Sequence, residues 1–316
     1  MGKVLITGAS GFINANLTRR MLKEGHEVSV LLRKTSNVNR IKEILSQVNV
    51  MSGDLLDYDT LQKEVHQFNP DYIFHSATYG SYPDDQKNDD LMVQTNIIGT
   101  YNLLKATQDI PYKCFIHAGS SSEYGLKGNV MSENDCLEPV NQYGVTKASA
   151  TLFCQLFAKR DRKNIVILRP FSVYGPYEKG TRLISYVILR CLQKKEVQMT
   201  SGEQKRDFIY VEDVVDVYLK VMGKEGIEGQ IFNLGRGEDI SVREVVEMIF
   251  ELTKSDLSLL KIGAKEKRAF EAVRSWKADT SKLNQVLGFK SRTPLREGLQ
   301  RTIEWMKNHQ EYYAHE

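Results

Sequence analysis

The sequence of 316 residues has no long apolar run, few cysteines and histidines, and no large excess of charge of either sign. Its apolar stretches are much shorter than the roughly 20 residues that span a bilayer. Met1 leads directly into a short apolar strand rather than a signal peptide, so we expect a cytoplasmic protein without membrane contact. The 43 basic and 40 acidic residues nearly balance. Because no basic run is interleaved with aromatic residues, nucleic acid is not an expected partner.

Cysteines and histidines are too scattered to indicate disulfides or a metal site. The four cysteines share no Cys-x-x-Cys spacing and stand in apolar or loop contexts, which indicates reduced thiols. The six histidines form no ligand cluster, so we expect no bound metal. We expect His117 to be an interior histidine with its hydrogen bonds satisfied. With 41% apolar and 26% charged residues, the composition is that of an ordinary globular enzyme.

The start of the chain has the pattern of a phosphate-binding turn. Residues 3–7 form a short β-branched apolar run, and an apolar pattern at helical spacing follows through residues 17–22. Between them, Gly8 permits a tight turn, and Gly11 allows the backbone to approach a pyrophosphate at the N-terminus of the helix. This order of strand, turn and helix predicts a dinucleotide site. Asn14 stands where the pattern usually has a third glycine, and we expect its side chain to crowd the helix against the strand.

The second expected strand, residues 27–32, lacks a carboxylate at its end. In a dinucleotide site this position lies beside the ribose, where an acidic side chain accepts a hydrogen bond from the 2′-hydroxyl of NAD. Arg33 and Lys34 follow the strand instead. Because NADP carries a phosphate at that point, basic groups favour it. We therefore expect NADP(H) to be preferred, with NAD(H) as the alternative.

Tyr143 and Lys147 are four residues apart in a segment with helical character, so they share one helix face, one turn apart. A free phenol has a pKa near 10. An adjacent ammonium stabilises the phenolate and lowers that pKa toward neutrality. The spacing therefore predicts an acid–base pair.

The first 170 residues alternate β-rich runs, near residues 4, 28, 48, 72, 115 and 165, with helical patterns. This alternation predicts an α/β fold with a doubly wound, Rossmann-type parallel sheet. No linker or repeat divides the remaining chain, so we expect a smaller, discontinuous α/β lobe that binds substrate. The expected domains are residues 1–171 with 207–235 for the dinucleotide, and 172–206 with 236–316 for the substrate.

Further motifs accompany these two anchors. They are Gly53-Asp54-Leu55, Phe74-His75-Ser76-Ala77, Thr95-Asn96-Ile97-Ile98-Gly99-Thr100, Gly119-Ser120-Ser121-Ser122-Glu123-Tyr124-Gly125 and Arg169-Pro170-Phe171-Ser172-Val173-Tyr174-Gly175-Pro176. With the glycine turn and the Tyr143–Lys147 pair, they resemble the extended short-chain dehydrogenase/reductases over almost the full chain. That family comprises NAD(P)-dependent nucleotide-sugar epimerases, dehydratases and reductases.

The resemblance implies a catalytic set and a cofactor site. Ser120 would hold the substrate oxygen while Tyr143 passes the proton, with Lys147 and Asn96 completing the set; Ser121 is the competitor of Ser120. The residues expected at the cofactor are Gly8, Ser10, Gly11, Phe12, Ile13, Arg33, Lys34, Asp54, Leu55, Ala77, Tyr143, Lys147 and Pro170.

The resemblance also implies a nucleoside diphosphate sugar as substrate. Two arginines match positions that grip the pyrophosphate, Arg206 and Arg268, with Arg274 as a less regular alternative to Arg268. The sugar is expected near Tyr79, Tyr82, Ser120, Ser121, Tyr143 and Ser172. In the family, helices that begin near Leu91 and Asn141 form a dimer interface, so a homodimer is expected.

The residues after Ser120 help to choose among the family's reactions. Dehydratases use an Asp-Glu pair there, whereas this chain has Ser121 and Ser122, so dehydration is not expected. The expected NADP preference favours net reduction, and segments 191–195 and 201–209 are similar to 4-ketoreductases of the CDP-abequose synthase type. We therefore expect an NADP-dependent reductase of a nucleotide-activated 4-keto-6-deoxy sugar. A nucleotide-sugar 4-epimerase is the alternative, and a non-catalytic NADP-sensing regulator is the third interpretation.

Overall fold

A computed structural model of the chain describes residues 1–82, 85–265 and 275–313. The chain divides into two compact units, here called unit 1 and unit 2. Unit 1 comprises Met1–Gly125, Asp135–Pro170 and Val215–Phe232, and unit 2 comprises Leu126–Asn134, Phe171–Val214 and Asn233–Glu316. No helix in the described ranges combines the length and the apolar composition that a bilayer span requires.

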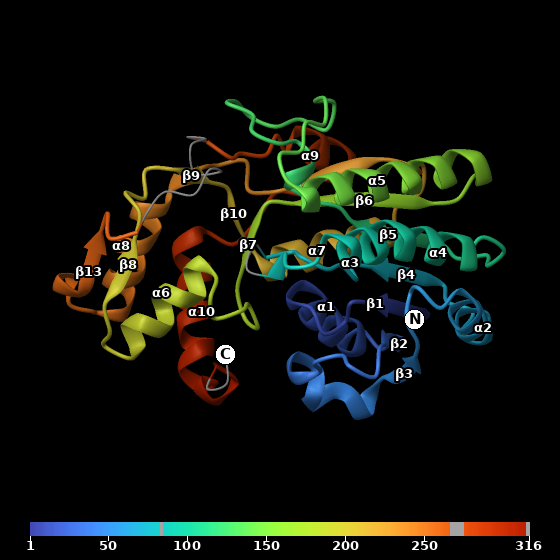
Figure 1. Cartoon of the computed structure of the whole chain (residues 1–316), viewed down its shortest axis with the longest axis horizontal. Helices are drawn as coiled ribbons and strands as arrows, with labels where there is room; N and C mark the ends of the chain where they lie inside the picture. Colours follow the sequence, from blue (N-terminus) through green and yellow to red (C-terminus); the bar gives the residue numbers. More distant parts are fainter. Residues whose placement is uncertain (83–84, 266–274, 314–316) are drawn as a thin grey trace. The chain divides into compact units, whose positions relative to one another are not determined.

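A seven-stranded sheet forms the centre of unit 1, in the order β11-β6-β5-β4-β1-β2-β3 (Figure 1). The strands are β1 (Lys3–Thr7), β2 (Glu27–Leu32), β3 (Asn49–Ser52), β4 (Tyr72–His75), β5 (Cys114–Ala118), β6 (Ile165–Pro170) and β11 (Ile231–Leu234). From β3 to β6, neighbouring strands pair in parallel. The strand order reverses between β1 and β4, and ligands bind at the carboxyl ends of strands beside such a reversal.

Helices cover both faces of this sheet. On one face, α2, α4 and α5 enclose a core with the sheet, and α4 and α5 lie side by side (Figure 1). Elsewhere in the unit, α1 packs on β1 and β2, and α7 places Tyr218 against Phe74 of β4. An ion pair between Arg20 and Asp216, 3.3 Å long, joins α1 to α7. The helices are α1 (Phe12–Lys23), α2 (Tyr58–Phe68), α3 (Asp89–Val93), α4 (Gly99–Ala106), α5 (Gln142–Asp161) and α7 (Val211–Met222).

Local sequence signals explain where several helices begin. The side chains of Asp57, Asn88 and Asn141 each accept a backbone hydrogen bond at the start of α2, α3 and α5, as N-terminal capping residues do. Short irregular helices complete the unit. They are the 3-10 helices η1 (Asn39–Gln47) and η4 (Ser121–Glu123), and the π-helix η3 (Gln94–Ile98) between α3 and α4.

Unit 2 has its own apolar core, in which α6, α8 and α10 pack with β8 and β10. Its strands are β7 (Ser172–Tyr174), β8 (Val197–Met199), β9 (Lys205–Arg206), β10 (Phe208–Tyr210), β12 (Ile240–Ser241) and β13 (Leu260–Ile262). Its helices are α6 (Leu183–Leu192), α8 (Val242–Thr253), α9 (Ser281–Leu287) and α10 (Leu295–Asn308), with the 3-10 helices η5 (Leu257–Leu259) and η7 (Gln310–Tyr313).

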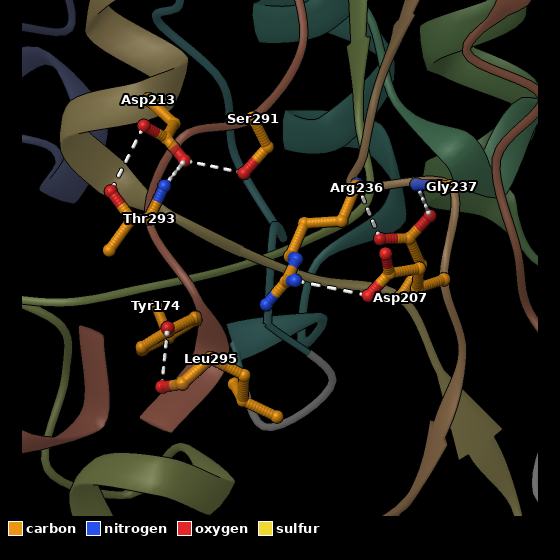
Figure 2. A network of polar contacts seen from close by, with 9 residues as sticks. Tyr174, Asp207, Asp213, Arg236, Gly237, Ser291, Thr293 and Leu295 are labelled. Atoms are coloured by element: carbon orange, nitrogen blue, oxygen red, sulfur yellow. Dashed lines mark hydrogen bonds and ion pairs between the residues drawn. The ribbon is translucent and has the colours of Figure 1, made fainter. Parts of the chain in front are cut away.

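A buried carboxylate, Asp207, ties three segments of unit 2 together (Figure 2). It accepts backbone hydrogen bonds from Arg236 at 2.7 Å, Gly237 at 3.0 Å and Ala278 at 3.1 Å. Burial raises its pKa to about 6 despite these bonds. A Cβ at Gly235 would lie 2.5 Å from the Asp207 carboxylate, so the loop after β11 requires glycine at this position.

A second buried carboxylate, Asp213, holds the segment that precedes α10. It accepts hydrogen bonds from the Ser291 hydroxyl at 2.5 Å and from the Thr293 amide and hydroxyl at 3.1 Å (Figure 2). Tyr174 donates to the Leu295 carbonyl at 3.3 Å. Unit 2 is thus fixed internally by polar contacts as well as by its apolar core.

The predicted fold class is confirmed: the chain is an α/β protein with a Rossmann-type parallel sheet and a lobe of smaller sheets. The compact units differ from the predicted domain bounds, because residues 126–134, 171, 207–214 and 233–235 belong to unit 2. The division of labour between the two parts stays a prediction.

Candidate cofactor cavity and active site

A cavity of about 300 Å³ lies in unit 1, where β1, β2 and β4 end. Eight of the predicted cofactor residues line it: Gly8, Ser10, Gly11, Phe12, Arg33, Asp54, Leu55 and Ala77. Its further lining residues are Thr7, Leu31, Leu32, Thr35, Ser36, Asn37, Arg40, Gly53, Ser76, Thr78, Ser81, Tyr82 and Thr95. Ile13, Lys34 and Pro170 of the predicted set are not among the lining residues, nor are Tyr143 and Lys147.

The glycine turn forms one wall of this cavity. Gly8 has a φ of 70°, and a Cβ there would lie 2.6 Å from the Ala77 amide nitrogen after β4. Only glycine fits so close an approach of two chain segments. Gly11 begins α1 as its N-cap and provides no side-chain cap for the helix. The amides of the first turn of α1 therefore remain available to an anion, and the helix dipole favours one.

Asn14 is buried where the pattern usually has glycine, and the crowding of helix against strand stays a prediction. Its side chain is 1% exposed, donates to the Thr7 carbonyl at 2.9 Å, and accepts from the Ser76 hydroxyl at 3.2 Å. It thus joins the start of α1 to the ends of β1 and β4. These two contacts provide hydrogen-bond partners for the buried amide group.

The end of β2 is basic, as the sequence indicated, but the structure adds a second arginine. Arg33 lines the cavity together with Arg40, whose guanidinium lies 3.5 Å from the Ser10 carbonyl. The sequence analysis missed Arg40 because it lies seven residues beyond Arg33, in η1, without a motif of its own. Thr35 and Ser36 also line the cavity, and the Ser36 hydroxyl accepts a hydrogen bond from the Arg33 amide at 3.0 Å. This arrangement offers an anion two guanidinium groups and hydrogen-bond donors.

The predicted acid–base pair lies at the start of α5. Asn141 caps this helix through the Gly144 amide at 2.7 Å, so Tyr143 occupies the first turn and Lys147 the next. A Cβ at Gly144 would lie 2.5 Å from the Ser122 carbonyl, and η4 packs on α5 there. This close contact places the turn that follows Ser120 directly against the turn that carries Tyr143.

The side-chain amide of Asn96 is hydrogen-bonded to other protein groups at both its oxygen and its nitrogen. Its oxygen accepts from the Thr78 hydroxyl at 2.9 Å and the Tyr79 amide at 2.7 Å. Its nitrogen donates to the Tyr79 carbonyl and the Thr146 hydroxyl, both at 3.0 Å. Thr146 in turn donates to the Tyr143 carbonyl at 2.9 Å. Asn96 therefore connects the loop after β4 to the helix of the acid–base pair, and its catalytic role stays a prediction.

Burial lowers the pKa values of Lys147 and of two neighbouring histidines, His75 and His117. Lys147 is 3% exposed, and desolvation lowers the pKa of its ammonium group to about 8, although Glu123 acts in the opposite direction. Burial also lowers the pKa of His75 to about 3, and the pKa of His117 falls well below its usual value. His117 is interior as predicted, but neither ring nitrogen has a hydrogen-bond partner among the described residues. The expectation of satisfied hydrogen bonds was wrong: the buried ring packs against the ring of His75, whose own nitrogens bond to Thr7 and Thr100.

The carboxylate nearest the serine run is already engaged. Glu123 is fully buried and forms an ion pair with Arg169 at 2.8 Å. It also accepts from the Ser120 amide at 2.7 Å. A carboxylate held in this way is not free to remove a proton from a substrate.

The predicted substrate residues fall in different parts of the chain. Tyr82 lines the cavity, while Ser121 is buried in η4 of unit 1. Ser172 begins β7 and Arg206 ends β9, both in unit 2. The Arg206 guanidinium lies 5.9 Å from the centre of the Trp276 ring. Arg268 and Arg274 lie outside the described residues.

Comparison with known proteins relates this site to a family. The family model described as "NAD dependent epimerase/dehydratase family" matches residues 4–235. The chain is 31% identical to the uncharacterized UDP-glucose epimerase YtcB of Bacillus subtilis, over 97% of this chain and 98% of YtcB. The structure of MoeE5 in complex with UDP-glucuronic acid and NAD is 32% identical, with a TM-score of 0.83 over 97% of this chain and 99% of that one. The UDP-glucose 4-epimerase of Thermotoga maritima, solved with UDP-glucose, is 26% identical, with a TM-score of 0.88 over 97% and 99%.

We predict that Asn14→Ala destabilises unit 1, because the variant loses both contacts between α1 and the strand ends. The expected loss in the free energy of unfolding is about 2 kcal/mol. Chemical denaturation of the wild type and of Asn14→Ala measures this difference in the free energy of unfolding. The matched control is Asn16→Ala on the same helix, which removes a half-buried bond to the Phe12 carbonyl and should cost about 0.5 kcal/mol. Equal losses in the two variants would contradict the bridging role of Asn14.

Proposed function

Because the chain belongs to the NAD dependent epimerase/dehydratase family, we propose that it is a nucleotide-sugar 4-epimerase that uses a nicotinamide dinucleotide. The sequence alone favoured net reduction. The relatives favour the epimerase over the reductase, since YtcB is described as a UDP-glucose epimerase and the Thermotoga maritima protein as a UDP-glucose 4-epimerase. The observation that carries the proposal is that the acid–base pair of α5 lies against the turn after Ser120, where the carboxylate of that turn, Glu123, is already engaged with Arg169 and the Ser120 amide.

The cavity of unit 1 fits a dinucleotide. The uncapped N-terminus of α1 suits the pyrophosphate, and Asp54 and Leu55 suit the adenine end. The bare backbone at Gly8 and Gly11 leaves room for close approach. When bound, the nicotinamide would supply the acceptor and donor of the hydride.

The chain's own residues would move the proton. Tyr143, as phenolate, would take the proton of the C4 hydroxyl while the C4 hydrogen leaves as hydride, and would return the proton to the C4 oxygen while the hydride is returned to the opposite face of C4. Lys147 would stabilise the phenolate with its buried positive charge. Ser120 would hold the C4 oxygen, and Asn96 would keep the helix start in place through Thr146. This set is sufficient for oxidation and reduction at one carbon.

Dehydration needs more than this set, because a C5 proton must be removed and the C6 hydroxyl protonated. Ser121 and Ser122 occupy the two positions where dehydratases carry an acid and a base. Glu123 cannot replace them, because it is engaged with Arg169 and Ser120. The proposal therefore excludes a 4,6-dehydratase.

Direct assay tests the proposal. The purified protein is incubated with UDP-glucose or UDP-glucuronate, the ligands found with the relatives, and with oxidised dinucleotide, and the 4-epimers are separated by chromatography. We expect interconversion of at least one pair. Tyr143→Phe should lower kcat about a hundredfold or more, because proton transfer is lost. Full turnover by Tyr143→Phe would contradict the proposed mechanism.

A second candidate, an NADP-dependent 4-ketoreductase, is favoured by the basic end of β2. Arg33 and Arg40 line the cavity where NADP carries its extra phosphate, and no carboxylate follows β2. A net reductase must draw on NADPH. Consumption of NADPH with a 4-keto-6-deoxy nucleotide sugar, without interconversion of epimers, would favour this candidate over the epimerase.

Single substitutions at the two arginines test the cofactor preference. We expect Arg33→Ala and Arg40→Ala each to weaken NADPH binding about tenfold, through loss of a charged hydrogen bond, and to leave NADH binding nearly unchanged. Titration of cofactor fluorescence gives both affinities. Lys34→Ala is the matched control, since Lys34 does not line the cavity. Equal weakening of NADPH and NADH would show that the arginines do not contact the extra phosphate.

We also propose a homodimer through α4 and α5. Apolar side chains are exposed along these helices and the end of η3: Ile98, Tyr101, Val145, Leu152 and Leu156 are each at least 37% exposed. Apolar rows of this kind mark protein interfaces, and the family resemblance points to a second copy as the partner.

The double substitution Leu152→Glu with Leu156→Glu tests this interface. We expect the wild type to elute as a dimer and the variant as a folded monomer in light-scattering chromatography, because charges on the face oppose its burial. Leu257→Glu, at an equally exposed leucine of unit 2, is the control and should remain dimeric. A monomeric wild type would contradict the proposal.

A further inference from the structure

Glu123 fixes the backbone of the serine run from inside the protein. Its Oε1 accepts the Ser120 amide at 2.7 Å, and the Ser120 hydroxyl accepts the Ser122 amide at 3.1 Å. These reciprocal bonds form a capping box at η4. A Cβ at Gly119 would lie 2.6 Å from Oε1, so the strand end is shaped around the carboxylate. Glu123 therefore holds the backbone of Ser120, while the Ser122 amide holds its hydroxyl group.

The partner of Glu123 is also buried. Arg169 on β6 is 1% exposed, and its Nε and Nη2 donate to Oε2 of Glu123 at 2.9 Å and 2.8 Å. Its guanidinium lies 4.6 Å from the centre of the Tyr124 ring. A buried ion pair contributes little net stability compared with a well-packed apolar pair, whereas removal of one partner strongly destabilises the fold. Stability alone thus gives no reason for a carboxylate at this position.

Titratable groups on several neighbouring elements interact electrostatically with Lys147. Its electrostatic neighbours are Glu123 in η4, Cys154 on the same helix, His75 on β4 and His117 on β5. Burial raises the pKa of the Cys154 thiol and lowers the pKa of both histidines, so all three are neutral at physiological pH. Apart from the phenolate that Tyr143 would form in the reaction, Glu123 is therefore the anionic group of this set. It raises the pKa of the Lys147 ammonium, whereas desolvation lowers it.

We propose that Glu123 is a positioning residue for the reaction: it fixes the backbone of Ser120 and supplies the negative charge that faces Lys147, while Arg169 holds it in place. The inference rests on the proposed function, because it assigns Ser120 and Lys147 to the reacting centre. It explains why a charge pair occupies this interior position. One carboxylate would serve both catalytic side chains.

The pH dependence of kcat tests this role. Lys147 is a cation below its pKa and neutral above it, so activity should fall at high pH with a midpoint near 8 in the wild type. In Glu123→Gln, which keeps an acceptor for the Ser120 amide, the midpoint should move down by about one pH unit. The double variant Glu123→Gln with Arg169→Met leaves no unpaired buried charge, and its midpoint should lie between the other two. Asp213→Asn is the control, since it removes another buried carboxylate and should leave the midpoint unchanged.

A second readout does not depend on turnover. Competitive labelling with trace acetic anhydride, followed by mass spectrometry of the peptide that contains Lys147, reports the ionisation of this amine in each variant. In Glu123→Gln, the pH midpoint of labelling at Lys147 is expected to move down by about one unit, as the midpoint of kcat does. A wild-type midpoint in every folded variant, by both readouts, would overturn the positioning role. Absence of turnover by the wild type on all nucleotide sugars, with the labelling shift intact, would instead count against the proposed function.

Discussion

The close approach of β1 and β4 at their carboxyl ends is the constraint on which the rest of the site depends. Gly8 leaves too little space for any side chain beside Ala77. That contact sets where α1 begins, and Asn14 then joins the helix to both strand ends. The cavity, the exposed amides of α1 and the basic end of β2 all follow from this arrangement. Parallel pairing brings the relevant strand ends to one edge.

A second feature is the concentration of buried charge beneath the acid–base pair. Lys147, Glu123 and Arg169 are each at most 3% exposed. The attraction of Glu123 for each of the two cations offsets part of their desolvation, and the neutral histidines and thiol nearby leave these three as the charged members of the buried cluster. Electrostatic interactions in such a buried environment are strong, so these fixed charges would contribute to the field that acts on Tyr143.

Local patterns predicted the fold and much of the cavity. The alternation of strands and helices, the glycine turn and the spacing of Tyr143 and Lys147 are visible within short windows of sequence. Contacts between distant residues were not visible in this way. Arg169 lies 46 residues from Glu123, and Arg40 reaches the cavity only because η1 folds back over α1. The hydrogen bonds of Asn14, and the missing partners of His117, likewise depend on which strands become neighbours.

The central claim is that this edge of the sheet holds a dinucleotide that exchanges a hydride with C4 of a nucleotide sugar. The most direct test uses a UDP-hexose that carries deuterium at C4, with mass spectrometry of the product and of the bound cofactor. The account predicts that the 4-epimer retains the deuterium and that the label appears transiently on the nicotinamide. Loss of the label to water, with no deuterium on the cofactor, would contradict it.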